Sequence, residues 1–205
     1  MQKTIEVELR GLLTKDQYQQ LEKTLRSKGQ FKQTKRRVLI DYSTFLPAEG
    51  IRDRTKDIRL RVTNGMPEII VKLGKWGGTE NRKELSVMAN KGEFDKLVEI
   101  FAALGLTKGI LAIRNSEIYD YHEIEFALVE VPGHSYYFEA EKMIGAGENI
   151  AKAKQTIEAE LLKLNLTWFD NETFFKYIDS LNAEANEVFD YNNYSDNYFQ
   201  KRFNL

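Results

Sequence analysis

Charged residues stand at every second position in several successive segments of this chain, and this alternation constrains the fold more than any other feature. Glu6, Glu8 and Arg10 alternate with aliphatic residues, and Arg59 and Arg61 do the same further on. Successive side chains of a strand point to opposite faces, so such segments form sheets with one apolar and one charged face. The charged face either meets water or lines an interior.

The remaining pattern predicts an α+β protein in which helices interrupt a run of antiparallel strands. Strands are expected at 5–12, 33–42, 57–63, 68–73, 81–88, 109–115, 117–131 and 135–144, and helices at 15–28, 92–104, 149–164 and 171–187. Thr14 and Gly29 are the expected cap and stop of the first helix, and Asn64-Gly65 and Pro132-Gly133 the expected hairpin turns. Eight such strands are enough to close a barrel, so we predict an eight-stranded antiparallel closed β-barrel, a tunnel, with flanking helices and a C-terminal helical extension.

Bulk properties limit the classes of function. The chain has 205 residues, 42% of them apolar and 30% charged, which predicts one folded, globular domain. Its 30 basic and 31 acidic side chains leave a net charge of −1, which argues against a nucleic-acid partner or a membrane surface. Cysteine is absent and no apolar run is long enough for a membrane span, so we expect a cytoplasmic protein. Both a monomer and a homodimer stay open.

Two Glu-x-Glu pairs bracket the main part of the chain. Glu6 and Glu8 lie in the first strand, and Glu139 and Glu141 lie in the last. A closed barrel brings its first and last strands together, so these four carboxylates could hold one or two divalent cations. Because the chain has only two histidines and no cysteine, the expected metal is Mg²⁺ or Mn²⁺.

Basic residues dominate the strands between these acidic pairs. Arg59, Arg61, Lys72 and Arg82 each lie on the face opposite the aliphatic residues of their strand. A solvated sheet face would explain any one of these strands, but acids at both ends with bases between them favour a charged barrel interior. Divalent cations facing a basic wall form a polyphosphate pocket, because the cations bridge phosphate oxygens and the bases neutralise the remaining charge.

At this point the chain resembles the CYTH, or triphosphate tunnel metalloenzyme, superfamily. Its members include class IV adenylyl cyclases, thiamine triphosphatases and inorganic triphosphatases. The resemblance extends from about Ile5 to Leu164 and rests on the order of short motifs. The matching residues are Glu6/Glu8/Arg10, Arg59/Arg61, Lys72, Arg82/Glu84, Arg114 and Glu139/Glu141.

The resemblance implies a tunnel domain at 1–165 and a role for each matching residue. A C-terminal helix and an aromatic, Asn-rich tail at 166–205 would pack on the same domain. The implied metal ligands are Glu6, Glu8, Glu139 and Glu141, the implied phosphate ligands are Arg10, Arg59, Arg61, Lys72, Arg82 and Arg114, and the implied catalytic residues are Glu8, Arg10 and Glu139.

Three positions depart from the family pattern. Arg10 stands where the family has lysine, which replaces a compact ammonium with a planar fork. Ser86 and Val129 stand where the family tends to have acids. Glu125 and Glu123 lie on the same strand face as Val129 and could partly substitute for the acid that is missing there. These changes predict one well-bound metal and a second bound poorly.

Other conspicuous residues have ordinary explanations. Trp76 between glycines could stack on a base or a thiazolium, but packing at the barrel rim is the better interpretation. The Lys35-Arg36-Arg37 run could extend the phosphate wall, but a solvated strand end is favoured. His122 and His134 could shuttle protons or could be surface residues without a role.

The predicted function is hydrolysis of a small-molecule triphosphate, such as inorganic tripolyphosphate, a nucleoside triphosphate or thiamine triphosphate, with a divalent metal. Water is the simplest nucleophile, and the sequence shows no pocket for a nucleobase. One alternative is a class IV cyclase that converts ATP to cyclic AMP and pyrophosphate. Another is a polyphosphate- or nucleotide-binding module without turnover. A glycosidase is a remoter idea, because a basic interior suits a neutral sugar poorly.

Overall fold

The computed structural model describes residues 5–47, 52, 54–76, 82–145 and 147–205. Its strands are β1 (Ile5–Leu13), β2 (Gln30–Asp41), β3 (Lys56–Thr63), β4 (Met66–Leu73), β5 (Lys83–Met88), β6 (Lys108–Tyr121), β7 (Ile124–Val131), β8 (Ser135–Ile144) and β9 (Glu187–Asp190). Its helices are α1 (Lys15–Lys28), α2 (Phe94–Ala103), α3 (Ile150–Lys163), α4 (Asn171–Glu184) and α5 (Tyr198–Phe203), with short 3₁₀ turns at Ser43–Phe45 and Tyr191–Asn193. None of the described helices is long and apolar enough to span a membrane.

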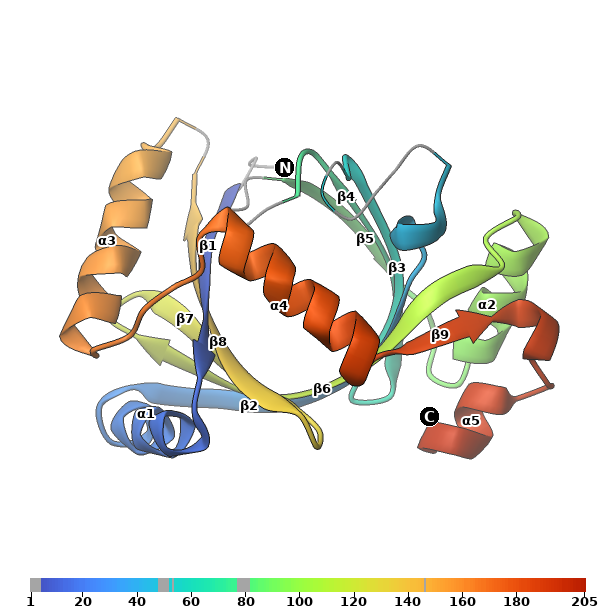
Figure 1. Ribbon diagram of the computed structural model, residues 1–205, viewed down its shortest axis with the longest axis horizontal. Coiled ribbons are helices and arrows are strands. Elements are labelled where there is room, and N and C mark those ends of the chain that lie inside the picture. Colours follow the sequence, from blue (N-terminus) through green and yellow to red (C-terminus); the bar gives the residue numbers. More distant parts are fainter. Residues whose placement is uncertain (1–4, 48–51, 53, 77–81, 146) are drawn as a thin grey trace.

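The strands form one antiparallel sheet in the order β1-β8-β7-β6-β2-β3-β4-β5, with β9 added beside β6. The sheet curls into a half-barrel whose concave side faces α4 (Figure 1). Among the described residues β1 and β5 are the two edges and do not pair with each other, so the predicted closed barrel is wrong. All six residues of β5 are exposed, including the apolar side chains of Leu85, Val87 and Met88.

Several local predictions are confirmed. Helix α1 begins with a capping box in which Thr14 and Gln17 exchange side-chain and backbone hydrogen bonds, and the Gly29 amide donates to Leu25 at its end. Asn64 and Gly65 turn the β3–β4 hairpin with φ of 51° and 82°. These features follow from contacts between residues close in sequence, which is why the sequence predicts them well.

The predicted break between strands at residue 116 is wrong. Strand β6 runs without interruption to Tyr121, and the hairpin to β7 turns at His122-Glu123. Both turn residues have positive φ, 50° and 61°, a conformation usually taken by glycine or asparagine. His-Glu carries no such sequence signal, so the turn was missed.

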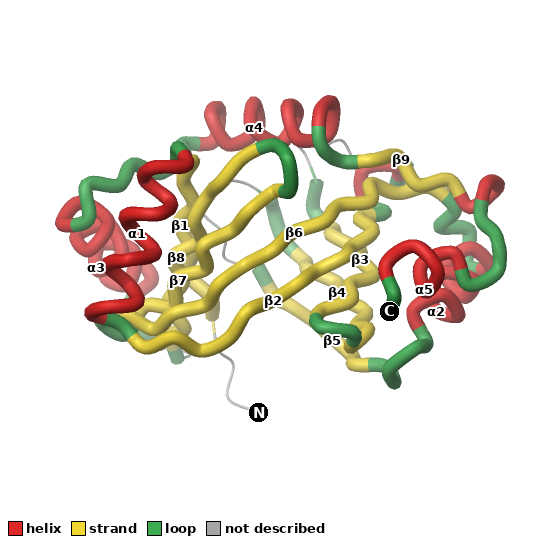
Figure 2. Tube along the Cα trace, turned by 90° about the horizontal axis from the view of Figure 1, so that it is seen from below, coloured by secondary structure: helices red, strands yellow, loops and turns green. Residues whose placement is uncertain are grey.

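Two apolar cores cover the convex side of the sheet. One lies under α1 and α3 and includes Leu25, Phe126 and Ile157. The other lies under α2 and α5 and includes Phe94 and Phe199. Figure 2 shows the two helix pairs at opposite ends of the curved sheet. Both cores pack against the apolar faces of the strands, so the charged faces point to the concave side.

The C-terminal segment docks on the half-barrel. Helix α4 ends at Glu184 instead of the predicted residue 187, and β9 then pairs with β6. Buried Asp95 of α2 accepts hydrogen bonds from the Tyr194 hydroxyl and from the backbone amides of Phe199 and Gln200. The division of the chain at residue 165 stays a prediction.

Candidate functional site

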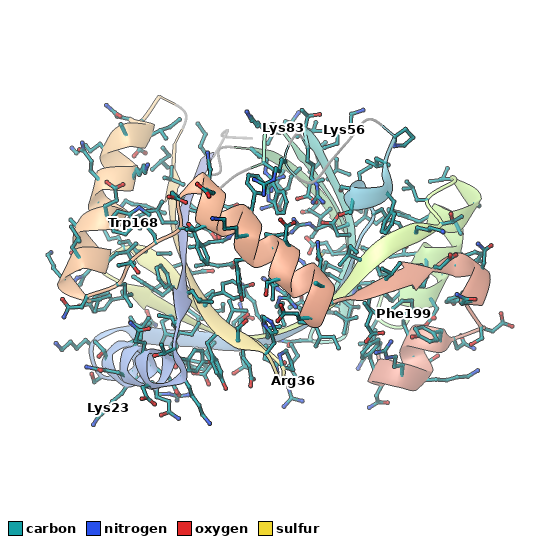
Figure 3. All side chains as sticks on the ribbon, viewed as in Figure 1. Lys23, Arg36, Lys56, Lys83, Trp168 and Phe199 are labelled. Atoms are coloured by element: carbon teal, nitrogen blue, oxygen red, sulfur yellow. The ribbon has the colours of Figure 1, made fainter. Side chains whose placement is uncertain are left out.

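The charged faces of the strands converge on the concave side of the sheet, beneath α4 (Figure 3). They line a cavity of about 260 Å³, named the phosphate cavity after the ligand that the sequence analysis predicts. The predicted site residues that line it are Glu6, Glu8, Arg10, Arg59, Arg61, Lys72, Glu139 and Glu141. The prediction of a charged interior is therefore confirmed, although the barrel is open.

The two acidic pairs meet because β1 and β8 are hydrogen-bonded neighbours. Glu8 is the register partner of Glu141, and Arg10 is the partner of Glu139. The acidic pairs therefore come together without the closed barrel that was expected to join them. On the open side the Lys72 Nζ reaches across the bore and lies 3.8 Å from Glu6 Oε2.

Arg10 clamps two of the predicted metal ligands. Its Nε and Nη2 donate to the two carboxylate oxygens of buried Glu8, each at 2.7 Å, and Nε lies 3.2 Å from Glu139 Oε1. The planar fork of arginine matches a carboxylate in this bidentate way, which a lysine ammonium cannot do. In this chain a guanidinium therefore neutralises Glu8.

A second acidic group forms around Glu141. Burial, together with the charges of Glu6, Glu125 and Glu139, raises the pKa of Glu141 to about 7. Glu125 is the register partner of Glu141 and lines the cavity, whereas Glu123 points outward to Lys142 at 3.0 Å. Of the two acids that could substitute for the family's missing one, only Glu125 therefore faces the cavity.

The donor set fits a hard divalent cation. It contains only carboxylates, as Mg²⁺ and Mn²⁺ prefer, and a cation would relieve the repulsion that raises the pKa of Glu141. Within the described part of the chain, no three acidic or histidine side chains already converge on a common point. Binding of a cation by three of these carboxylates would therefore require side chains to move.

The basic side chains of β3 and β4 are held in place by carboxylates on the neighbouring strands. Arg61 Nη2 donates to Glu68 at 2.6 Å, and Lys72 Nζ donates to Glu84 at 3.1 Å. Burial and the charge of Arg37 lower the pKa of Arg61. These bases are therefore aligned along the cavity before any ligand arrives.

Asp57 is a buried carboxylate that sequence reasoning did not identify. It is 0% exposed and accepts from Arg59 Nε at 2.8 Å and from Arg82 Nη1 at 3.0 Å, with Arg54 at 3.6 Å. Burial alone would raise the pKa of Asp57, but the charges of Arg59, Arg54 and Arg82 outweigh it and hold that pKa well below its usual range. The available signal was its position two residues before Arg59, on the same strand face.

The solvated interpretation of the Lys35-Arg36-Arg37 run is wrong for two of its residues. Lys35 and Arg37 line the phosphate cavity, and only Arg36 lies on the outside (Figure 3). Burial and the charge of Arg37 lower the pKa of Lys35. The signal was again the period of two, which puts the first and third residues of the run on one face.

Two predicted phosphate ligands lie elsewhere. Arg82 is held against Asp57 and does not line the phosphate cavity. Arg114 lines a second cavity of about 160 Å³ between α4 and the sheet, here called the α4 cavity, and donates to Asn186 at 3.0 Å. Arg10 and Glu139 line both cavities, so the two spaces are adjacent.

The remaining singled-out residues have structural explanations. Trp76 packs edge-on against Phe174 and Phe175 of α4, with the Arg54 guanidinium 4.4 Å from its ring, so packing at the rim is confirmed. His122 contacts Glu160 and His134 contacts Glu184, and neither histidine lines the phosphate cavity or the α4 cavity. Of the departures other than Arg10, Ser86 is exposed on β5, and Val129 is buried and lines the α4 cavity.

Comparison with known proteins places the fold. No protein-family model and no curated protein sequence matches this chain. The PH1819 protein of Pyrococcus horikoshii has a TM-score of 0.67 at 22% identity, covering 85% of this chain and 98% of that one. A Vibrio parahaemolyticus protein assigned as an adenylate cyclase gives 0.60 at 17% identity, covering 80% and 90%.

A third solved structure comes from Hippeastrum. This protein, assigned as an adenylyl cyclase and found to have a dominant triphosphatase activity, gives a TM-score of 0.55 at 15% identity, covering 82% of this chain and 90% of that one. At such identities the likeness shows a shared fold and nothing of the chemistry. The resemblance drawn from the sequence is thereby confirmed at the level of the fold.

Proposed function

We propose that this chain, which has the fold of triphosphatases and cyclase-like proteins, is a divalent-metal-dependent phosphohydrolase that acts on a triphosphate. The single observation that carries the proposal is the phosphate cavity. Its bases and acids face one another across one space in a chain whose net charge is only −1. Such a local concentration of both signs suits a polyanion bound with a cation.

The basic side chains would bind the phosphate oxygens. Arg37, Arg59, Arg61 and Lys72 follow one another along β2, β3 and β4 and all line the cavity. Carboxylate partners hold Arg59, Arg61 and Lys72 in place, so little entropy of these side chains is lost when phosphate binds. Arg82 would act through Asp57, by keeping that carboxylate ionised behind Arg59.

The acidic side chains would hold the cation and handle the proton. Bound Mg²⁺ or Mn²⁺ would neutralise phosphate charge and make water a better nucleophile. Glu6, Glu139 and Glu141 would hold it, and Glu8 would join them once Arg10 turns toward phosphate. Without the cation the pKa of Glu141 is raised to about 7, and a bound cation would lower it, so Glu141 would release its proton as the cation binds.

Arg10 would act as an exchangeable counter-ion. It remains protonated at all relevant pH values, so it cannot serve as a base. Its guanidinium neutralises Glu8 in the absence of ligand and would stabilise the charge that develops on phosphate during hydrolysis. Glu8, Arg10 and Glu139 are therefore the proposed catalytic residues.

The test is a phosphate-release screen with tripolyphosphate, ATP and thiamine triphosphate, each with Mg²⁺ and with Mn²⁺. We expect orthophosphate from at least one of them, and at least about a 100-fold loss of kcat/KM in Glu139→Ala and Arg61→Ala. Glu123→Ala is the matched control, because Glu123 is an exposed glutamate outside both cavities.

The alternatives give different products. Pyrophosphate with cyclic AMP from ATP would indicate the cyclase. Thermal stabilisation by tripolyphosphate without any product would indicate a binding module. Full activity in both Glu8→Ala and Glu139→Ala would show that these residues do not form the active site.

A further inference from the structure

The C-terminal segment contacts both the backbone and the side chain of Arg10. In the loop that leads into α4, the backbone amide of Phe169 donates to the Arg10 carbonyl at 2.8 Å. At the next residue of β1, a Cβ on Gly11 would lie 2.1 Å from the Thr167 carbonyl oxygen, so the chain passes too close here for any side chain. The segment that follows α3 is therefore packed directly against the part of β1 that carries Arg10.

Phe174 of α4 makes the contact with the Arg10 side chain. The central carbon of the guanidinium lies over the Phe174 ring, 5.7 Å from the ring centroid. Phe174 is only 2% exposed and packs edge-on against Trp76 and Phe175, so its ring has little freedom to move. A cation over the face of a buried aromatic ring is attracted to it, because that face carries partial negative charge.

The ring contact and the carboxylate contact of Arg10 do not compete. Nε and Nη2 donate to the two carboxylate oxygens of Glu8, each at 2.7 Å. The attraction of Phe174 acts on the charge of the whole guanidinium and leaves these hydrogen bonds intact. When phosphate replaces Glu8 as the acceptor, the ring can therefore continue to hold the guanidinium in place.

We propose that Phe174 is a positioning residue, which keeps the Arg10 guanidinium in place while Glu8 is exchanged for phosphate. This inference rests on the proposed function, because only there does Arg10 act on phosphate. It gives the C-terminal helix a part in the chemistry, although the family motifs end before α4 begins. An arginine at position 10 suits this arrangement, since a guanidinium combines a bidentate carboxylate pair with an aromatic contact and an ammonium does not.

The neighbouring residue of α4 offers a matched control. Phe175 is 7% exposed and packs against the same Trp76. It lies 5.2 Å from the Arg52 guanidinium, whereas Arg10 lies over Phe174. Phe174→Leu and Phe175→Leu therefore remove a ring from the same cluster, and only the first removes the ring beneath Arg10. Phe174→Met is a second variant without a ring, for use if the leucine variant does not fold, and Phe174→Tyr retains the ring.

The first measurement follows Arg10 in the ligand-free protein, by NMR of the arginine Nε–H groups. The Arg10 signal is identified by its loss in Arg10→Lys. A ring beneath the guanidinium shifts this proton signal upfield, and a proton held in a hydrogen bond exchanges slowly with water. In Phe174→Leu we expect the signal to move downfield and its exchange with water to become about threefold faster. Phe175→Leu and Phe174→Tyr should keep the position of the parent signal.

The second measurement separates kcat from KM for phosphate release, with the triphosphate that the screen identifies. Because Arg10 acts when charge develops on phosphate, Phe174→Leu should lower kcat about tenfold and leave KM within about twofold of the parent value. Phe175→Leu should lose a similar amount of thermal stability and keep kcat within about twofold. Phe174→Tyr should retain at least about half of the parent kcat.

Two results would overturn the inference. One is an Arg10 signal that keeps its position and its exchange rate in Phe174→Leu or Phe174→Met. The other is an equal loss of kcat in Phe174→Leu and Phe175→Leu, which would mean that the ring acts only through the stability of α4. If the parent protein releases no phosphate, the proposed function fails, and the NMR comparison alone decides whether Phe174 holds Arg10.

Discussion

Individual buried charges hold the side chains of the phosphate cavity in place, and Asp57 is the clearest example. It is fully buried and pairs with Arg59 and Arg82, with Arg54 close by. The net value of such a cluster is small, because burying each charge costs nearly as much as pairing returns. Removing one partner is different, since the others remain buried without compensation.

Asp57→Asn should therefore lower the free energy of unfolding by about 3–5 kcal/mol, measured by urea denaturation at pH 7. The control is Glu123→Gln, which breaks an exposed pair with Lys142 and should have no measurable effect. An Asp57→Asn protein as stable as the parent would show that the three arginines do not depend on this carboxylate.

Glu141 predicts a pH dependence of stability. Its pKa is raised from 4.5 to about 7, so the folded protein holds a proton that the unfolded chain releases. The Glu141 contribution to stability is thus fully present below pH 4.5 and is lost as pH rises through about 7. In EDTA, the difference in melting temperature between Glu141→Gln and the parent should grow in favour of the variant over this window.

A constant difference between the two proteins from pH 4.5 to 8 would contradict this assignment. Mg²⁺ should reduce the difference at pH 8, because a cation compensates for the ionised carboxylate of the parent and not for the amide.

At the scale of elements, α4 is attached differently from the other helices. Helices α1, α2, α3 and α5 pack into the two main cores, whereas α4 packs through a small separate cluster that includes Trp76, Phe174 and Phe175. Local clusters of this kind open independently of the global fold. We therefore expect α4 to open more readily than α3.

Phe174→Ala should speed hydrogen exchange of the amides of α4 by at least about tenfold while leaving those of α3 unchanged. Mass spectrometry of the exchanged peptides measures both in one sample. Ile157→Ala, in the core under α3, is the comparison, since it should accelerate exchange across both helices through the loss of global stability. Equal acceleration of α3 and α4 in Phe174→Ala would show that α4 belongs to the main fold.

For the whole molecule, the decisive feature is that the half-barrel stays open. Its two edges, β1 and β5, share no hydrogen bonds among the described residues, and the 3.8 Å contact of Lys72 with Glu6 reaches across the bore. A polyanion with its cation would bind both walls at once and so link them. Ligand binding should consequently stabilise the folded state as a whole.

Tripolyphosphate with Mg²⁺, at about 100 times its dissociation constant, should raise the melting temperature by roughly 5–10 °C. Sodium sulfate at the same ionic strength should give a far smaller shift, and Lys72→Ala should reduce the shift with tripolyphosphate. The measurement is thermal unfolding followed by circular dichroism. Equal shifts of the melting temperature with sulfate and tripolyphosphate would show that the stabilisation comes from general anion binding.

The sequence by itself determined the features that depend on neighbouring residues. The period of two assigned each charge to a strand face, and Thr14 and Asn64-Gly65 marked a helix start and a hairpin. These features need no knowledge of distant partners, because backbone geometry alone decides which side chains share a face. The sequence also supplied the acids and bases that line the phosphate cavity.

Only the tertiary structure decided which of these faces meet and how completely the sheet closes. The fold brought β1 beside β8, left β5 as an edge strand, and placed Arg82 and Arg114 away from the phosphate cavity. The fully buried Asp57 and the cavity under α4 likewise arise from contacts between segments far apart in the chain. Such contacts depend on packing that no local pattern encodes, since they reflect the balance of burial and pairing over the whole molecule.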